Sequence, residues 1–342
     1  MESMDREASR IRALLAHLHH ADPGELHLRH QRLRGGLQAT SVTRLAVRYR
    51  DARGRWRVHT LVVKRLAGSA AREAMVYQEL LASLPAALGP RLFAADRGTA
   101  GHEVLYLEAL RPVSAWPWGE LSAARGVLER AALLHRSTPA GGTVALLSAW
   151  DYEAELAASA LQTLEQLERL RRYAPPYFRN GLRWARRLVG HLPAIRHQLL
   201  ALGPLGTSVI HGDLHSANVI LRRRSGRAEP VLLDWGRARI GSPLEDVSTW
   251  LQSLGDWEPE TRRRHDTLLT GYLVARGMEG RLGPDLRAGY WLAGASNALA
   301  GALSHHLSVL GDERVPRVRA ARAAHSAPQW MRVLRRADAF WS

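Results

Sequence analysis

The chain has 342 residues, of which 46% are hydrophobic and 23% charged, and 48 Lys and Arg against 32 Asp and Glu give a formal net charge of +16. The apolar share excludes a largely disordered chain, and the length favours two packed lobes over one core. The absence of cysteine excludes a disulfide scaffold, a thiolate zinc site and a cysteine nucleophile. Because the N-terminus is charged and no run of about 18 apolar residues occurs, we expect no membrane span and a cytoplasmic protein.

The basic residues are spread along the whole chain. The densest runs, at 222–224 and 262–264, are short and far apart, whereas a nucleic-acid surface concentrates its cations in one stripe with aromatic residues between them. We therefore expect no specific nucleic-acid partner. Lys64 differs from the rest because it is the only lysine among the 48 basic residues. An ammonium retained in an arginine-rich chain indicates a need for a compact cation at that position.

The hydrophobic pattern predicts a sheet-rich N-terminal part. A helix is expected over residues 6–20, with its apolar side chains on one face. The following elements are expected in chain order: strands at 26–34, 42–50 and 56–66, a helix from Ser69 to Leu84, and strands at 91–96 and 103–109. Lys64 lies near the end of the third strand, which is apolar and β-branched and therefore predicted to be buried.

From Leu121 onward the pattern is mostly helical. Long helices are expected at 151–173 and 180–202, and a short hairpin-like interruption is expected at 207–240. A stretch rich in Pro, Trp and Gly separates the two parts and predicts a linker. Three segments result: a sheet-rich N-terminal lobe at 1–110, a hinge or linker at 111–120, and a mostly helical C-terminal lobe at 121–342.

The hairpin-like interruption contains the residues that indicate chemistry. It includes His211-Gly-Asp213-Leu-His215-Ser-Ala-Asn218, and a second apolar stretch ends in Leu-Asp234-Trp. Asp213 and Asn218 are five residues apart, the offset between the catalytic Asp and the metal-holding Asn of the protein-kinase loop. Phosphoryl transfer needs a carboxylate that accepts the proton of the attacking hydroxyl, and hard oxygen ligands for Mg²⁺. Asp213 suits the first role, and Asn218 and Asp234 suit the second.

With these motifs the sequence resembles the aminoglycoside phosphotransferase and choline-kinase-like enzymes, which share the protein-kinase fold, over roughly residues 30 to 310. The resemblance implies an α+β, bilobal fold with a small antiparallel-sheet N-lobe and a larger, mostly helical C-lobe. It also implies that Lys64 contacts the α- and β-phosphates of ATP and pairs with a glutamate on the next helix. Glu73 supplies that glutamate. Glu79 is the second choice, because its later place in the helix is typical of an exposed charge.

The resemblance also assigns further nucleotide contacts. The turn Gly35-Gly36 lies where the family covers the phosphates, although it lacks the Gly-x-Gly-x-x-Gly pattern of protein kinases. Backbone groups of Leu107 and Ala109 are expected to contact the purine edge. The neighbouring Tyr106 has two interpretations: it crowds adenine and favours GTP, or it is packed with its hydroxyl satisfied. We expect ATP as the donor, with GTP as a second possibility.

Supporting roles follow from the same resemblance. His211 is expected to fix the catalytic loop, and Asp246 to bond back to that loop. His215 is expected to pack near the metal, and neither histidine to act as a metal ligand or base. Ser216 lacks the glycine pattern of a nucleophile. No activation loop separates Asp234 from Asp246, which disfavours a regulated kinase of protein substrates.

The sequence therefore predicts a small-molecule O-phosphotransferase that uses ATP and Mg²⁺, with an aminoglycoside or another antibiotic as the hydroxyl substrate. Its role is antibiotic resistance, biosynthesis or metabolism, and the pattern does not separate the three. The alternatives are a kinase of an amino alcohol, sugar or nucleoside, and a non-catalytic nucleotide-binding member of the fold. Three carboxylates either bind a polycationic substrate or form a solvated loop: Asp256, Glu258 and Glu260. Three tryptophans are candidates for an aromatic cage around a choline-like cation or for ordinary core: Trp250, Trp257 and Trp291. The pattern makes no prediction of oligomeric state.

Overall fold

The computed structural model describes residues 2–341 apart from 20–22, 24, 34–38, 52, 69–70, 99–100, 171–175, 225 and 256–258. It divides into two compact units. The first consists of Met1–Val113, Arg222–Arg227 and Val231–Arg237, and the second of Ser114–Leu221, Ala228–Pro230 and Ala238–Ser342. The first unit therefore contains the sheet-rich part of the sequence together with two short segments from the far side of the predicted linker.

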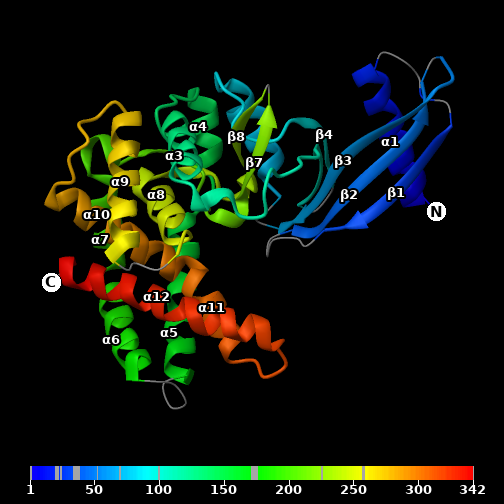
Figure 1. The fold of residues 1–342 in the computed structure, drawn as a ribbon. Helices are drawn as coiled ribbons and strands as arrows, with labels where there is room; N and C mark the ends of the chain where they lie inside the picture. The colour runs from blue at the N-terminus through cyan, green and yellow to red at the C-terminus, as the bar shows by residue number, and fades with distance from the viewer. Residues whose placement is uncertain are drawn as a thin grey trace. The chain divides into compact units, whose positions relative to one another are not determined.

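The first unit is built on a five-stranded antiparallel sheet with the strand order β1-β2-β3-β5-β4 (Figure 1). Its strands are β1 (Leu26–Arg32), β2 (Ala39–Arg50), β3 (Trp56–Ala67), β4 (Leu92–Arg97) and β5 (His102–Glu108). The register pairs Lys64 of β3 with Val42 of β2 and with Leu105 of β5. Lys64 therefore lies in the central strand of the sheet, where the apolar run before it had predicted a buried strand.

A hydrophobic core lies between this sheet and α1 (Glu2–His19), which covers one face of the sheet in Figure 1. Ile11, Leu14 and Leu15 follow the spacing of one helical face, and they pack against inward-facing residues of the strands such as Leu45 and Leu61. Burying one such side chain contributes about 1.5–3 kcal/mol. This core stabilises the strand that carries Lys64.

The helix predicted after β3 is shorter and less regular than expected. It consists of α2 (Glu73–Met75), a π-helical turn (Val76–Leu80) and a 3-10 turn (Leu81–Ser83). Arg72 at its N-cap contributes no side-chain cap. The carboxylate of Glu103, in β5, accepts a hydrogen bond from the backbone N–H of Ala74 at 3.1 Å instead. The start of α2 is thus stabilised by a residue from a neighbouring strand.

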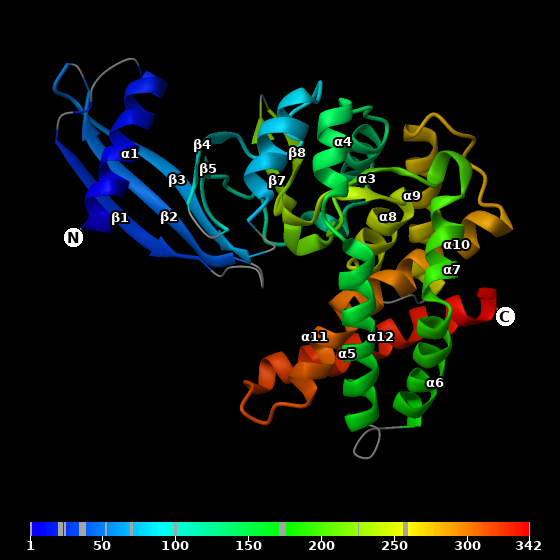
Figure 2. The same cartoon turned by 180° about the vertical axis from the view of Figure 1, so that it is seen from behind.

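The second unit is mostly helical. Its helices are α3 (Leu121–His135), α4 (Gly141–Ser148), α5 (Tyr152–Leu170), α6 (Pro176–Gly190), α7 (Leu192–Leu200), α8 (Pro243–Gln252), α9 (Pro259–Ala275), α10 (Pro284–Asn297), α11 (Leu303–Leu310) and α12 (Arg317–Trp341). A π-helical segment, Ala298–Ala302, joins α10 to α11. Helix α5 lies beside α6, and α12 packs against α6, α10 and α11 (Figure 2).

Two parts of the second half differ from the sequence prediction. The helix expected at 180–202 is split into α6 and α7, because Pro193 lacks a backbone N–H and is accepted only in the first turn of a helix. The interruption expected as one hairpin contains two separate strand pairs, β6 with β9 and β7 with β8. These strands are β6 (Ser208–Ile210), β7 (Val219–Arg224), β8 (Arg227–Leu232) and β9 (Arg239–Gly241).

Candidate active site

Lys64 lies in a buried cluster of charged side chains in the first unit. Its ammonium donates to Glu73 Oε2 at 2.5 Å and to Asp234 Oδ1 at 2.7 Å. Lys64 is 7% exposed and Glu73 1%, whereas Glu79, the second choice, is an exposed residue. The structure therefore brings together three of the predicted site residues, from β3, from α2 and from the segment after β8.

The backbone around Asp234 is held in an uncommon conformation. Asp234 has a φ of 63°, and no other non-glycine residue in the described part of the chain has a positive φ. Such a conformation costs about 1–3 kcal/mol and persists where the surroundings determine it. The backbone N–H of the next residue, Trp235, donates to Glu73 Oε1 at 3.1 Å. Glu73 therefore binds Lys64 with one oxygen and the turn at Asp234 with the other.

The pKa values in this cluster reflect burial and the imbalance of charge. Burial raises the pKa of Glu73, and the neighbouring Asp234 adds to the rise although Lys64 opposes it. Burial lowers the pKa of Lys64, but Glu73 and Asp234 outweigh this effect and hold it above its ordinary value. One ammonium faces two carboxylates, so the ionised cluster has an excess of negative charge. Because the side chain of Asp234 is 22% exposed, this excess suits a divalent cation.

The other expected nucleotide contacts lie on β5 and before β2. Gly35 and Gly36 are outside the described residues. Leu107 is paired with both neighbouring strands, and Ala109 lies just beyond the end of β5. Tyr106 is 3% exposed and packs in the core beneath α1, where burial raises its pKa to about 12. Of its two interpretations, the structure favours the packed tyrosine.

Asp213 lies in a loop of the second unit that follows β6. The Asn218 amide Nδ2 donates to the backbone oxygen of Asp213 and to its Oδ2, both at 3.0 Å. The ring Nε2 of His215 lies 3.7 Å from the same Oδ2, and its Nδ1 accepts a hydrogen bond from the Ala217 N–H at 3.2 Å. The Asp213 side chain is 37% exposed. The loop thus presents a carboxylate that is oriented by its neighbours and reachable from solvent.

The loop that carries Asp213 is anchored to α8 by Asp246. One oxygen of Asp246 accepts a hydrogen bond from the His211 N–H at 2.7 Å, and the other accepts one from the Gly212 N–H at 2.8 Å. The Asp213 N–H in turn donates to His211 Nδ1 at 3.3 Å. His211 and Asp246 are both buried. The structure thus brings both side chains to the loop that carries Asp213.

Two residues that sequence reasoning missed extend this anchor. His135 in α3 places Nε2 3.0 Å from Asp246 Oδ2 and Nδ1 2.8 Å from the hydroxyl of Tyr272 in α9. Burial lowers the pKa of His135, although its hydrogen bond with Asp246 opposes this. Burial favours a higher pKa for Asp246, but its hydrogen bonds with His135 and with the backbone N–H of His211 outweigh this effect and hold the pKa below its ordinary value. A histidine at the end of an apolar helix has no pattern that marks such a role.

The sequence did contain one signal for the position of Asp246, a capping box at the start of α8. The Ser242 hydroxyl accepts a hydrogen bond from the Leu244 N–H at 3.3 Å, and Glu245 Oε2 accepts one from the Ser242 N–H at 3.1 Å. The pattern Ser-x-x-Glu predicts such a start. It would have placed Asp246 in the first turn of a helix.

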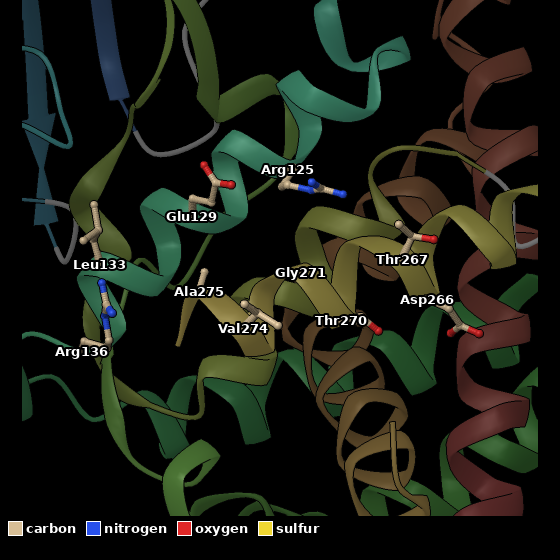
Figure 3. A pocket seen from close by; sticks show the side chains of 10 residues that line it. All are labelled: Arg125, Glu129, Leu133, Arg136, Asp266, Thr267, Thr270, Gly271, Val274 and Ala275. Atoms are coloured by element: carbon tan, nitrogen blue, oxygen red, sulfur yellow. The ribbon is translucent and has the colours of Figure 1, made fainter. Parts of the chain in front are cut away.

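The side chains of the three weaker substrate candidates lie outside the described part of the structure. Asp256 and Glu258 lie outside the described residues, as does the side chain of Glu260 in α9. A groove of about 830 Å³ lies between α3 and α9 (Figure 3). It is lined by Leu133 of α3 and Val274 of α9 among others, and by none of the residues predicted from the sequence.

The tryptophans proposed for an aromatic cage are mostly core residues. Trp250 is fully buried, packs edge-on against Trp118 and donates its indole N–H to the Ala124 carbonyl at 3.2 Å. Trp291 is 7% exposed, and Trp257 lies outside the described residues. Trp250 and Trp291 therefore have no open ring face to offer a cation.

The part of the chain that the structure describes holds no group of three or more His, Cys, Asp and Glu side chains that could bind a metal ion. Mg²⁺ usually takes one or two protein carboxylates and completes its shell with phosphate oxygens and water. A metal that enters together with a nucleotide is compatible with this arrangement. None of the described helices is long and apolar enough to span a bilayer.

Comparisons with known proteins agree with the motifs. The family model described as Phosphotransferase enzyme family matches residues 49–288, more than half of the chain. An ethanolamine kinase structure from Plasmodium vivax aligns with a TM-score of 0.56 at 9% identity, over 89% of this chain and 82% of that one. Amicoumacin kinase hAmiN, in complex with AMP-PNP, Ca²⁺ and Ami, aligns with a TM-score of 0.53 at 16% identity, over 89% and 88%.

A third structure, an aminoglycoside phosphotransferase from Alicyclobacillus acidocaldarius, aligns with a TM-score of 0.52 at 14% identity, over 90% of this chain and 92% of that one. No curated protein matches the chain. The low identities show the fold alone and confirm the predicted α+β, kinase-like class. The family match over residues 49–288 carries the further conclusion: the chain belongs to the phosphotransferase enzyme family and is a small-molecule phosphotransferase with a hydroxyl acceptor.

Proposed function

We propose that the enzyme transfers the γ-phosphate of ATP to a hydroxyl group of an aminoglycoside or another antibiotic. The observation that carries the proposal is the environment of Asp213, whose Oδ2 accepts a hydrogen bond from the Asn218 amide at 3.0 Å while the side chain stays 37% exposed. A carboxylate held in this way can accept a hydrogen bond from a substrate hydroxyl and take up its proton as the new O–P bond forms.

The proposal gives the charged cluster the task of binding the nucleotide. Lys64 neutralises charge on the α- and β-phosphates, and Glu73 holds the ammonium in place through a buried bond of 2.5 Å. The backbone of Leu107 and Ala109 binds the purine edge, and Gly35 and Gly36 cover the phosphates. The packing of Tyr106 in the core supports ATP over GTP, because a side chain directed into the core does not crowd adenine.

Asp234 and Asn218 are the residues that would hold Mg²⁺. Oδ2 of Asp234 and Oδ1 of Asn218 accept no hydrogen bond from the described residues, since only Asp234 Oδ1 and Asn218 Nδ2 are engaged. Carboxylate and amide oxygens are the hard ligands that Mg²⁺ prefers. When bound, the ion supplies positive charge against the phosphate oxygens. His211 and Asp246 keep the catalytic loop in place without contacting the reactants.

The antibiotic class is favoured over a choline-like substrate by the burial of Trp250 and Trp291, which removes two of the three candidates for an aromatic cage. Three carboxylates remain the candidates for binding amino groups of the substrate: Asp256, Glu258 and Glu260. A phosphorylation screen over aminoglycosides, macrolides, nucleoside antibiotics, amino alcohols and sugars, with ATP and GTP in parallel, tests the class. Phosphorylation of amino alcohols alone would contradict the proposal.

The catalytic assignment is tested with Asp213→Ala. Turnover should fall by about 10²–10⁴-fold, because the proton acceptor is lost, while Mg·ATP binding measured by calorimetry should be retained. Asp285→Ala is a matched control, since Asp285 is an exposed aspartate at the start of α10. Turnover at the wild-type rate in Asp213→Ala would refute the assignment. Binding of Mg·ATP by the wild type with no transfer to any acceptor would indicate the non-catalytic alternative.

A further inference from the structure

Two buried arginines in the second unit share one carboxylate. Arg239 of β9 donates to Glu245 Oε1 at 3.0 Å, and Arg196 of α7 donates to the same oxygen at 2.6 Å. The three side chains are only 3%, 4% and 1% exposed, respectively, for Arg239, Arg196 and Glu245. Two guanidinium groups facing one buried carboxylate is a costly arrangement, because each buried charge needs compensation. Capping of α8 by Glu245 does not require two buried guanidinium partners.

The two arginines differ in what else they contact. Arg239 Nη1 donates to the carbonyl oxygen of Gly212 at 3.3 Å. Arg196 Nε instead donates to Glu153 Oε1 at 2.9 Å, on the 54% exposed side chain of that glutamate. Gly212 is the residue directly before Asp213 and has a φ of 78°. Of the two arginines, only Arg239 is therefore bonded to the catalytic loop in the described part of the chain.

With the bond from Arg239, both backbone polar groups of Gly212 in the loop are hydrogen-bonded. The N–H of Gly212 donates to Asp246 Oδ1 at 2.8 Å, and its carbonyl accepts from Arg239. Gly212 lacks a side chain that would restrict its backbone, and at a positive φ it depends on such bonds for its orientation. Because the Gly212 carbonyl belongs to the peptide that enters Asp213, its direction sets where the carboxylate of Asp213 points.

The guanidinium of Arg239 is itself fixed. Its Cζ lies 3.6 Å from the ring centroid of Tyr152 and 6.0 Å from that of Trp150. Stacking on an aromatic face and a bond to a carboxylate together restrict a planar group in a way that an ammonium would not be restricted. Arg239 can therefore act as a rigid support between Glu245 and the loop.

We propose that Arg239 is a positioning residue for phosphoryl transfer, which holds the Gly212 carbonyl and thereby the direction of the Asp213 carboxylate. The inference rests on the proposed role of Asp213. With this role, Arg239 is a second anchor of the loop beside Asp246, and it lies in the segment that leads into α8. The role also explains why a second buried guanidinium faces Glu245. Arg196, which shares Glu245 but not the loop, carries no such role.

Arg239→Met and Arg196→Met form a matched pair, because each leaves Glu245 with one guanidinium partner. We expect Arg239→Met to lower kcat by about 10–100-fold with the KM for ATP unchanged, since small misplacement of a reacting group is costly. Arg196→Met should keep kcat within about twofold although it lowers the melting temperature at least as much. Equal losses of kcat in both variants, or an unchanged kcat in Arg239→Met, would overturn the proposal.

A second measurement keeps the test independent of turnover and of folding failure. Amide hydrogen exchange over residues 208–218 should be faster in Arg239→Lys than in Arg196→Lys, because a lysine retains the charge beside Glu245 but loses the planar fork that reaches Gly212. Equal exchange in the two variants would contradict the hold on the loop. If the wild type transfers phosphate to none of the screened acceptors, the proposed function fails, and the exchange rates still decide whether Arg239 anchors the loop.

Discussion

The two units hold their functional side chains in different ways. In the first, Lys64 is fixed by direct bonds to Glu73 and Asp234, so charged side chains hold one another. In the second, Asp213 is held through its loop, because Asp246 accepts two backbone N–H groups and the Asn218 amide binds the carboxylate. A charge cluster depends on the balance of its ions, whereas an anchored loop depends on geometry.

This difference predicts two kinds of failure. Removing a charge from the cluster should reduce stability and nucleotide binding together, because the remaining ions are left buried without compensation. Loosening the loop should reduce turnover while nucleotide binding is kept, because the carboxylate is still present but misdirected. Variants in the two regions can therefore be compared by three measurements: unfolding free energy, nucleotide affinity and kcat.

Among the variants that compare the two regions, the largest effect on stability is expected from Lys64→Met. Glu73 and Asp234 would face each other without the ammonium, and Glu73 is 1% exposed. The unfolding free energy should fall by about 3–5 kcal/mol, and phosphotransfer should fall by about 10²–10³-fold with weaker ATP binding. Denaturant titration, calorimetry and a coupled kinase assay measure the three quantities.

Two further variants control this result. Glu73→Gln in the Lys64→Met background should restore part of the stability but none of the activity, whereas Glu79→Gln should change neither, because Glu79 is exposed. Lys64→Arg retains the charge with a different shape. Wild-type turnover in Lys64→Arg would contradict the interpretation that this position needs a compact ammonium.

A smaller effect is expected from Asp246→Asn in the loop. The amide has one accepting oxygen, so one of the N–H groups of His211 and Gly212 loses its partner, at a cost of about 1–3 kcal/mol. We expect kcat to fall by up to about 10²-fold with unchanged ATP affinity. Asp266→Asn is the control, because Asp266 pairs with Arg287 on α10, away from the loop. A parallel loss of ATP affinity in Asp246→Asn would remove the distinction between the two regions.

The sequence singled out the residues of the charged cluster and of the loop because they lie in short motifs, whereas the pairing of Lys64 with Glu73 was implied by the family resemblance and the bond from Lys64 to Asp234 spans 170 residues. The spacing of Asp213 and Asn218, the isolation of Lys64 in an arginine-rich chain and the position of Glu73 nine residues later are local features. The alternation of apolar and polar residues predicted the strands, and the apolar face of the first helix predicted the core beneath it. These patterns are also local in the sequence.

What could not be predicted depends on contacts between segments far apart in the chain. His135 bonds Asp246 of the loop anchor at 3.0 Å across 111 residues of sequence, and Tyr272 bonds His135 at 2.8 Å across 137 residues. The bond from Arg239 to Gly212 depends on the pairing of β6 with β9. A single arginine in a chain with 48 basic residues has no local pattern that separates it from a solvated one.

The pH dependence of stability should arise in part from the second unit. Burial lowers the pKa of His265 in α9 to about 3, below its value of about 6.5 in an unfolded chain. The folded state thus favours the neutral ring, so stability is complete above pH 6.5 and is lost as the pH falls towards 3. His265 alone should lower the unfolding free energy by about 2 kcal/mol between pH 7 and pH 5. In His265→Leu this difference should shrink by that amount, as measured by urea titration at both pH values, and an unchanged difference would contradict the assignment.

The smallest effect is expected from Tyr106→Phe, which tests whether the first region contacts the base through this residue. The ring lies in the core beneath α1 and is 3% exposed, so loss of the hydroxyl should change the unfolding free energy by only about 0.5–1.5 kcal/mol. The ratio of kcat/KM for ATP to that for GTP should stay as in the wild type, because a side chain packed in the core does not touch the purine. A shifted ratio would mean that Tyr106 faces the nucleotide, and donor choice in the first region would then depend on a side chain rather than on the backbone of β5.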